Sequence, residues 1–257
     1  MSVTEQTCTN QNHCTTYLSC HDWTNGWQDI LRNSSLYIPQ KDRQPSSAIP
    51  IPGRNETLIS LTDKTYIAKN KSLTVLKGNS EETGFLDYGC SSRSLKQLGC
   101  FGTYKFPLVS LSCALFPLES PDHSIWLNPL DIVEVSEQAG FSYITMAHGP
   151  GIVTSLRKRS IQKNAENALL VLAVHRKDHS WNTSDLSVPM DYLSLSPSPF
   201  THAIAKRPLL RRFPIPEQTL SKTLSKERMI AHFLKLDRYI AFDQLNYQTL
   251  AEMLTDF

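Results

Sequence analysis

The chain has 257 residues, a hydrophobic fraction of 40% and a formal net charge of +2, which are typical of a globular protein with a sizeable core. The sequence has no run of about 18 apolar residues, which a membrane-spanning helix requires. Its first residues show neither the basic nor the apolar segment of a secretory signal. We therefore expect a cytoplasmic protein, and the whole-chain charge indicates no particular partner.

The first 54 residues are rich in Thr, Asn, Gln and Ser and end in a proline-rich piece from Pro45 to Gly53. We interpret residues 1–54 as a polar, partly disordered N-terminal arm with room for one short helix. Trp23 and Trp27 supply apolar positions for that helix.

Three cysteines in this arm, Cys8, Cys14 and Cys20, are equally spaced, and His13 and His21 stand beside the last two. Structural zinc sites usually pair their ligands two to four residues apart, and this pattern does not. We expect neither a metal nor another cofactor, although the sequence leaves a metal role for these cysteines open.

Residues 55–180 have the pattern of a β-rich core with one helix. Their short runs of β-branched and alternating apolar residues predict strands, which an antiparallel sheet would pair. The predicted strands are Thr57–Leu61, Thr65–Ala68, Leu73–Leu76, Lys105–Phe116, Ile125–Leu127, Ile132–Val135, Phe141–Met146 and Ile152–Leu156.

One stretch of this core, "CALFPLESPDHSIWLNP" from Cys113 to Pro129, interrupts an apolar run with a turn and restarts it. Pro117 ends a strand because proline cannot donate a hydrogen bond to a ladder. Pro121 fixes the bend, and Trp126 restarts the next strand as a core anchor. The stretch is therefore a structural device and does not contact a substrate.

The period of the pattern becomes helical after residue 160. Ile161, Ala165, Ala168 and Leu172 form a stripe, with Ser160 as the expected N-cap. We expect residues 181–216 to be a Ser/Pro-rich linker and residues 217–257 to be a helical segment.

Two helices are expected in that last segment. Thr223–Ile240 would bury Met229, Ile230, Phe233 and Leu234, and Asp243–Leu254 would be capped by Asp243. The predicted fold class is α+β, with an antiparallel β-rich core followed by helices and two helices at the C-terminus.

Catalytic motifs are absent from the sequence, which contains no G-x-S-x-G, H-E-x-x-H, P-loop or G-x-G-x-x-G pattern. The most enzyme-like string is Ala147-His148-Gly149-Pro150-Gly151. A hairpin turn with an exposed histidine explains it better than a substrate contact. We expect no enzymatic activity.

The basic residues are unevenly distributed. Residues 151–212 hold ten basic and four acidic residues, whereas the rest of the chain holds 16 basic and 20 acidic residues. Arg157, Lys158 and Arg159 stand at the start of the predicted helix, where cations oppose the helix dipole. They have two interpretations: a phosphate-binding place, or a solvated loop.

The stretch from Asp87 to Val135, "DYGCSSRSLKQLGCFGTYKFPLVSLSCALFPLESPDHSIWLNPLDIVEV", resembles the central region of the competence transcription factor ComK family. Tyr88–Ser92 is similar to that family's aromatic-Gly-Ser-Ser segment. The landmarks that follow, in the family's order and spacing, are Leu115–Leu118, Ser120-Pro121, Ser124–Leu127 and Asp131–Val135. The resemblance covers roughly residues 57 to 175.

The chain departs from the family at two places. Arg93-Ser94-Leu95-Lys96 stands where the family has Tyr-x-Gly-Arg, so DNA contacts there would be altered. Phe213-Pro214-Ile215-Pro216 is at best a remnant of the string that delivers a family member to its protease adaptor.

The resemblance implies a sequence-specific transcriptional activator of DNA-uptake genes, which binds double-stranded A/T-rich boxes through the minor groove as a homo-oligomer. Contacts with RNA polymerase and with a protease adaptor would follow. The expected DNA-binding residues are Arg157, Lys158, Arg159 and Lys163, with a second patch at Ser92, Arg93 and Lys96. The alternative is a regulatory or protein-interaction adaptor that keeps the fold and no longer binds DNA.

Overall fold

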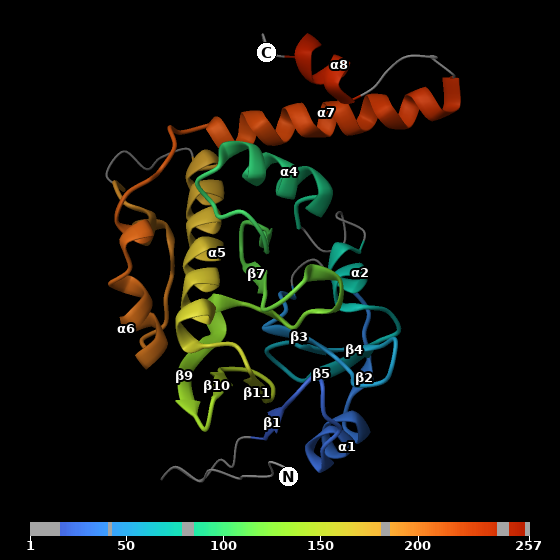
Figure 1. Cartoon of the computed structure of the whole chain (residues 1–257), viewed down its shortest axis with the longest axis vertical. Helices are drawn as coiled ribbons and strands as arrows, with labels where there is room; N and C mark the ends of the chain where they lie inside the picture. Colours follow the sequence, from blue (N-terminus) through green and yellow to red (C-terminus); the bar gives the residue numbers. More distant parts are fainter. Residues whose placement is uncertain (1–15, 41–42, 79–84, 181–185, 241–246, 255–257) are drawn as a thin grey trace.

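Short apolar runs form the strands of two sheets in the computed structural model, which describes residues 16–40, 43–78, 85–180, 186–240 and 247–254. The chain has the predicted α+β class, with strands before the long helices (Figure 1). The strands are β1 Tyr17–Leu18, β2 Ser35–Leu36, β3 Ser47–Pro50, β4 Thr57–Ser60, β5 Thr65–Ala68, β6 Leu108–Val109, β7 Ala114–Pro117, β8 Trp126–Leu127, β9 Ile132–Gln138, β10 Phe141–Met146 and β11 Gly151–Thr154.

The smaller sheet has the strand order β1-β11-β10-β9, and the larger has the order β2-β5-β4-β3-β8-β7-β6. Neighbouring strands are antiparallel, except that β1 pairs with β11 and β2 with β5 in parallel. The antiparallel core is therefore extended at one edge of each sheet by a parallel strand. Both of these strands come from the predicted N-terminal arm.

The helices pack around and beyond the sheets. They are α1 Asn25–Arg32, α2 Ser72–Lys77, α4 Tyr88–Leu98, α5 Lys158–Asp178, α6 Pro199–Ala205, α7 Thr219–Ile240 and α8 Tyr247–Met253, with 3-10 turns at Pro121–His123, Pro129–Asp131, Pro189–Tyr192 and Pro208–Arg211. In Figure 1, α4 and α7 lie at one end of α5, and the smaller sheet lies at the other end.

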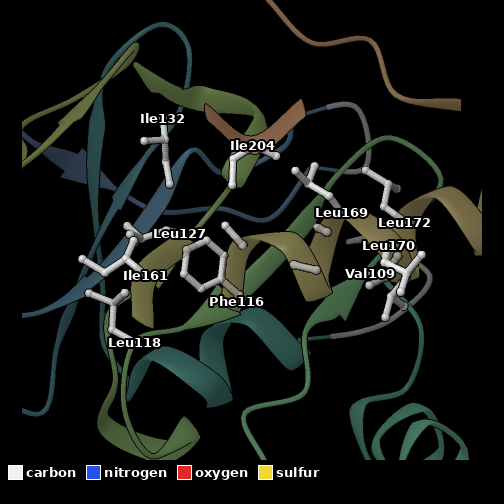
Figure 2. Packing of buried hydrophobic residues seen from close by; sticks show 14 of the residues in the cluster. Val109, Phe116, Leu118, Leu127, Ile132, Ile161, Leu169, Leu170, Leu172 and Ile204 are labelled. Carbon is white, nitrogen blue, oxygen red and sulfur yellow. The ribbon is translucent and has the colours of Figure 1, made fainter. Parts of the chain in front are cut away.

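Helix α5 forms the centre of the main core. The predicted stripe of Ile161, Ala165, Ala168 and Leu172 is fully buried, as expected. Residues 168–174 are also buried without interruption, so this part of the helix is enclosed on all sides rather than on one face. Figure 2 shows side chains of α5 together with those of the larger sheet and of α6.

The predicted arm is corrected by the structure over residues 16–40 and 43–54, which belong to the fold. Strand β3 lies inside the larger sheet between β4 and β8, and Ile49 and Trp27 are fully buried. Pro50 is tolerated there because β8 pairs only with Ser47 and Ala48, so the side of Pro50 that lacks an N–H faces no partner strand.

The predicted linker is also corrected where the structure describes it, from residue 186. Phe200, Ile204 and Leu210 are buried in the same apolar cluster as α5. Arg207 donates from Nε to Oε2 of the buried Glu166, at 2.6 Å. Residues 186–216 are therefore part of the core and do not separate two domains.

Two predicted strands have other structures. Residues 73–76 belong to helix α2, because Leu73 and Leu76 bury one helical face. Residues 105–116 form the two short strands β6 and β7. The Ser110 hydroxyl accepts hydrogen bonds from the N–H groups of Ser112 and Cys113, which reverses the chain and leaves Leu111 exposed.

The structural roles predicted for Pro117, Pro121 and Trp126 in the turn between Cys113 and Pro129 are confirmed. Pro117 is the last residue of β7, and Pro121 begins a 3-10 turn. Trp126 is fully buried, and its indole Nε1 donates to the Pro121 carbonyl at 3.0 Å. The buried indole is therefore bonded to the turn that precedes it, which accounts for the large aromatic residue at this position.

Helix α7 begins at Thr219, earlier than predicted, and of the four residues predicted to be buried only Ile230 is fully buried. Its buried residues include Leu220, Leu224 and Ile230, whereas Met229 and Phe233 are exposed and Leu234 is half-buried. Its buried residues also include Glu227, which meets Arg93 of α4. The second predicted helix is α8, and its predicted cap, residue 243, lies outside the described residues.

Candidate nucleic-acid interface

The first predicted DNA-binding patch lies at the start of α5. Arg157 is the N-cap residue in an extended conformation, and Lys158 and Arg159 occupy the first helical turn. Arg157, Arg159 and Lys163 are exposed and Lys158 is half-buried. The structure therefore brings these four predicted residues together on one accessible surface.

A carboxylate takes the place of the predicted cap Ser160 at this helix start. Oε1 of Glu137, on β9, accepts a hydrogen bond from the backbone N–H of Lys158 at 2.7 Å. Ser160 lies inside the helix instead, and the Arg157 carbonyl accepts its N–H at 2.9 Å. One of the free N–H groups expected to receive a phosphate is therefore occupied, and the three basic side chains remain for an anion.

The hairpin of β9 and β10 fixes the position of this helix start. Its two turn residues, Ala139 and Gly140, both have positive φ values, 49° and 83°, which is the type I′ geometry that matches strand twist. The Ser142 hydroxyl donates to the Leu156 carbonyl at 2.6 Å, just before Arg157. Phe141, the first residue after the turn, leaves 38% of its surface exposed.

Most of the other cations in residues 151–212 stabilise the fold. Arg176 donates to the carbonyls of Leu111, Ser112 and Tyr192, and Lys177 lies 4.4 Å from the centroid of the Phe213 ring. Over the part of the chain that the structure describes, no ion pair involves Arg157, Lys158, Arg159 or Lys163. These four remain for a partner.

The second predicted patch lies on α4 and has a different character. Arg93 donates from Nε to Oε2 of Glu227 on α7 at 2.7 Å, and the Glu227 side chain is only 2% exposed. The Ser92 hydroxyl donates to the Gly89 carbonyl within the helix. Lys96 is exposed. Only Lys96 therefore resembles the cations at the start of α5.

A groove of about 630 Å³ runs beside this second patch. Its wall includes Tyr104, which is 83% exposed, and Lys105, whose Nζ donates to the Leu118 carbonyl. The turn before Trp126 also lines the groove. The lining residues are Tyr88, Ser92, Arg93, Lys96, Thr103, Tyr104, Lys105, Phe106, Glu119, Ser120 and Pro121.

The structure does not bring the two predicted patches together. Asp178, the last residue of α5, accepts hydrogen bonds from the N–H groups of Gln218 and Ser221 where α7 begins. Helix α4 packs against α7 at this same end (Figure 1). The first patch is at the other end of α5, a helix of 21 residues that spans about 30 Å.

The enzyme-like string around His148 forms a packed turn. Gly149 has a φ of 82°, and a Cβ added there would lie 2.4 Å from the Ser60 hydroxyl oxygen. The Ser46 hydroxyl donates to the His148 carbonyl at 3.4 Å. The glycine is therefore needed for a close approach between the two sheets, and the string has a structural explanation.

The arm cysteines are only partly within the described residues, because Cys8, Cys14 and His13 lie outside them. In the described ranges, no three His, Cys, Asp or Glu side chains group as metal ligands would. Burial raises the pKa of the Cys20 thiol to about 11, so Cys20 is a thiol rather than a thiolate at neutral pH.

Sequence reasoning missed Glu137, Phe141, Tyr104 and Lys105. For Phe141 the only signal was Gly140 between two alternating segments, which indicates a turn but not its type, since Ala-Gly is not a typical hairpin pair. For Glu137 there was none, because its contact with Lys158 joins residues 21 positions apart.

No helix among the described residues has the length and apolar character to cross a membrane. No family model, curated protein or solved structure gives a significant match to the chain.

Proposed function

We propose that this protein is a DNA-binding transcriptional activator of the competence type, without enzymatic activity, which binds A/T-rich duplex through the minor groove. The observation that supports it is the cluster of Arg157, Lys158, Arg159 and Lys163 at the start of α5. Glu137 and the β9–β10 hairpin hold this cluster in place, and its side chains take no part in ion pairs with the described residues.

The physical reason lies in the DNA backbone. A cation that neutralises a phosphate releases a condensed counterion, so clustered basic side chains give affinity that falls steeply with salt. Narrow A-tract minor grooves concentrate negative potential and favour arginine. Cations at a helix start also oppose the helix dipole, and a bound phosphate would offset that cost.

The test replaces Arg157, Lys158 and Arg159 together by Ala and measures affinity for an A/T-rich duplex over a range of salt concentrations. We expect affinity to fall at least about tenfold, and the salt slope to shrink by roughly one unit for each phosphate that is no longer neutralised. A matched control replaces three other exposed cations, Lys69, Lys71 and Lys222, by Ala. Equal reductions in both variants would show a general charge effect and would contradict the proposed site.

Self-association belongs to this proposal, because an activator of this type works on paired boxes. Helix α7 offers a surface for it, or for RNA polymerase, through the exposed side chains of Met229, Phe233 and Leu236. Recognition by a protease adaptor through Phe213–Pro216 would have to expose Phe213, which is half-buried with its ring 5.6 Å from that of Tyr192.

A second candidate function is a regulatory adaptor that binds protein instead of DNA. It is favoured by the commitment of Arg93 to Glu227, which removes one cation from the second patch, and by the exposed apolar residues of α7. The same titration separates the two functions. An adaptor would bind A/T-rich and mixed duplexes equally weakly, and that result for the parent protein would overturn the DNA-binding proposal.

A further inference from the structure

Phe141 is placed at the tip of the β9–β10 hairpin, directly after a two-residue turn. It pairs with Gln138 across the hairpin and leaves 38% of its surface in solvent. The type I′ turn at Ala139 and Gly140 gives the tip one backbone conformation, so the ring stands at a fixed place instead of on a flexible loop. A single exposed aromatic residue is ordinary on a protein surface. Phe141 is of interest because a cluster of basic residues begins close to the same hairpin tip.

The cation cluster begins beside this tip. Ser142, the next residue after Phe141, is bonded through its hydroxyl to the Leu156 carbonyl, one residue before Arg157. Ser142 also stands opposite Thr154 in the β10–β11 pair. The strand that carries Phe141 and the chain that carries Arg157, Lys158 and Arg159 are therefore neighbours at one end of the smaller sheet. The Phe141 side chain projects there from the face opposite to that of Ser142.

The negative charge of Glu137, which lies near the tip, is offset within the fold and does not oppose an anionic partner. Glu137 directs Oε1 to the backbone N–H of Lys158 at 2.7 Å, where the positive end of the α5 dipole offsets its charge. The same bond ties the hairpin to the helix, so that the ring and the cations would approach a partner as one unit.

An exposed apolar ring at the same end of a sheet as a cluster of basic residues has a known use on duplex DNA. Proteins that bind the minor groove insert such a wedge between two base pairs, unstack them and bend the duplex, while arginine and lysine hold the phosphates on either side. Pyrimidine–purine steps, TA above all, unstack at the least cost, so a wedge also contributes preference for A/T-rich sites.

We propose that Phe141 is the wedge of the DNA interface: it enters the minor groove at a TA step and bends the duplex while the α5 cations hold the backbone. This inference rests on the proposed function, and it adds a residue and a deformation of the DNA that the cation cluster alone does not require.

The experiment compares the parent protein with Phe141→Ala, Phe141→Trp and the control Leu111→Ala. Leu111 lies in the other hairpin turn, between β6 and β7, and is 51% exposed. Each variant is first checked for a parent-like circular dichroism spectrum and unfolding midpoint. Binding is then followed on a duplex labelled at both ends for energy transfer, and on a second duplex with 2-aminopurine at the TA step.

We expect the parent to shorten the end-to-end distance and to raise the 2-aminopurine fluorescence, because a wedge unstacks the labelled base. Phe141→Ala should lose both signals and about tenfold in affinity. Phe141→Trp should keep both signals, and Leu111→Ala should match the parent throughout.

Each remaining outcome has a distinct meaning. If the parent binds A/T-rich duplex but leaves it straight and stacked, or if Phe141→Ala bends the duplex as the parent does, the wedge is wrong and the proposed function stands. If the parent binds no duplex, the proposed function fails and the wedge fails with it. Binding to one strand of the same site is measured in parallel. If Phe141→Ala weakens binding to that single strand and leaves duplex binding unchanged, the ring is a stacking platform for unpaired bases, and the wedge is again overturned.

Discussion

The two ends of α5 differ in the exposure and pairing of the charged side chains around them. At its start, Arg157, Lys158 and Arg159 stand at or near the surface and take no part in ion pairs with the described residues. At its end, Asp178 is nearly buried and accepts the first N–H groups of α7, and nearby Arg93 meets the buried Glu227. Buried charge needs a partner inside the fold, whereas exposed charge is available to an external one. Both predicted patches contain arginine, and they differ in whether a carboxylate of the fold already pairs with it.

The sharpest test of this contrast is Arg93→Ala. The change removes the guanidinium that binds the Glu227 carboxylate, which is 2% exposed. Because the Arg93 side chain is itself 44% exposed, we expect the free energy of unfolding to fall by about 2 kcal/mol. Urea unfolding measures it. Lys96→Ala is the matched control from the same helix, and it should change stability by no more than about 0.5 kcal/mol because Lys96 is exposed. Equal small losses would mean that Arg93 is as available to a partner as Arg157.

A second test uses pH at the buried end of α5. His175 is 4% exposed, and its Nδ1 has no hydrogen-bond partner among the described residues. Burial lowers the pKa of this imidazole to about 4, and His179, which lies 4.4 Å away between ring centroids, and Arg228 contribute to the same shift. Asp178 opposes the shift. The folded protein therefore keeps His175 neutral at pH values where the unfolded chain binds a proton.

Since the folded pKa is below the unfolded value of 6.5, stability is fully present above pH 6.5 and is lost as pH falls from there towards 4. At pH 5 the protonation of His175 alone makes the free energy of unfolding about 2 kcal/mol lower than it is well above pH 6.5. Unfolding of the parent and of His175→Gln should be compared at pH 7.5 and pH 5, since the carboxylates titrate alike in both. His202→Gln, at an exposed histidine, is the control. A parent that loses no more stability than His175→Gln over this range would contradict the prediction.

The sequence could predict what depends on local pattern and could not predict what depends on distant contacts. The α5 stripe and the Trp126 anchor follow from periodicity and turn residues, and both are confirmed. Strand β3 was missed because its four residues end in a proline and are central only once β8, far along the chain, pairs with them. For α7, the burial of Ile230 was predicted correctly, whereas Leu224 and Glu227 were not among the predicted buried residues; the contact of Glu227 with Arg93, 134 residues away, could not be read from the sequence.

The candidate site follows the same rule. The cations at the start of α5 are adjacent in sequence, so their cluster could be predicted without a structure. Phe141 joins them only because β10 and β11 pair, and Glu137 only because β9 passes the helix start. Arg93 was predicted to be like Arg157, since the sequence does not show that a buried carboxylate would meet it.

The smallest expected effect is on the stability of the variant in which Arg157, Lys158 and Arg159 are all replaced by Ala. Cations in the first turn oppose the helix dipole, so their removal should raise the free energy of unfolding slightly, by about 0.5 kcal/mol in total at low salt. The gain should shrink as salt screens the dipole. Urea unfolding at two salt concentrations measures both effects, and Arg93→Ala, with its large loss of stability, provides the contrast.

If the triple variant instead loses more than about 1 kcal/mol of stability, beyond what exposed substitutions usually cost, these side chains stabilise the hairpin and the helix start. A fall in DNA affinity would then report on folding rather than on binding. If stability is retained while affinity falls, the start of α5 is a binding surface, which is what separates it from the buried end.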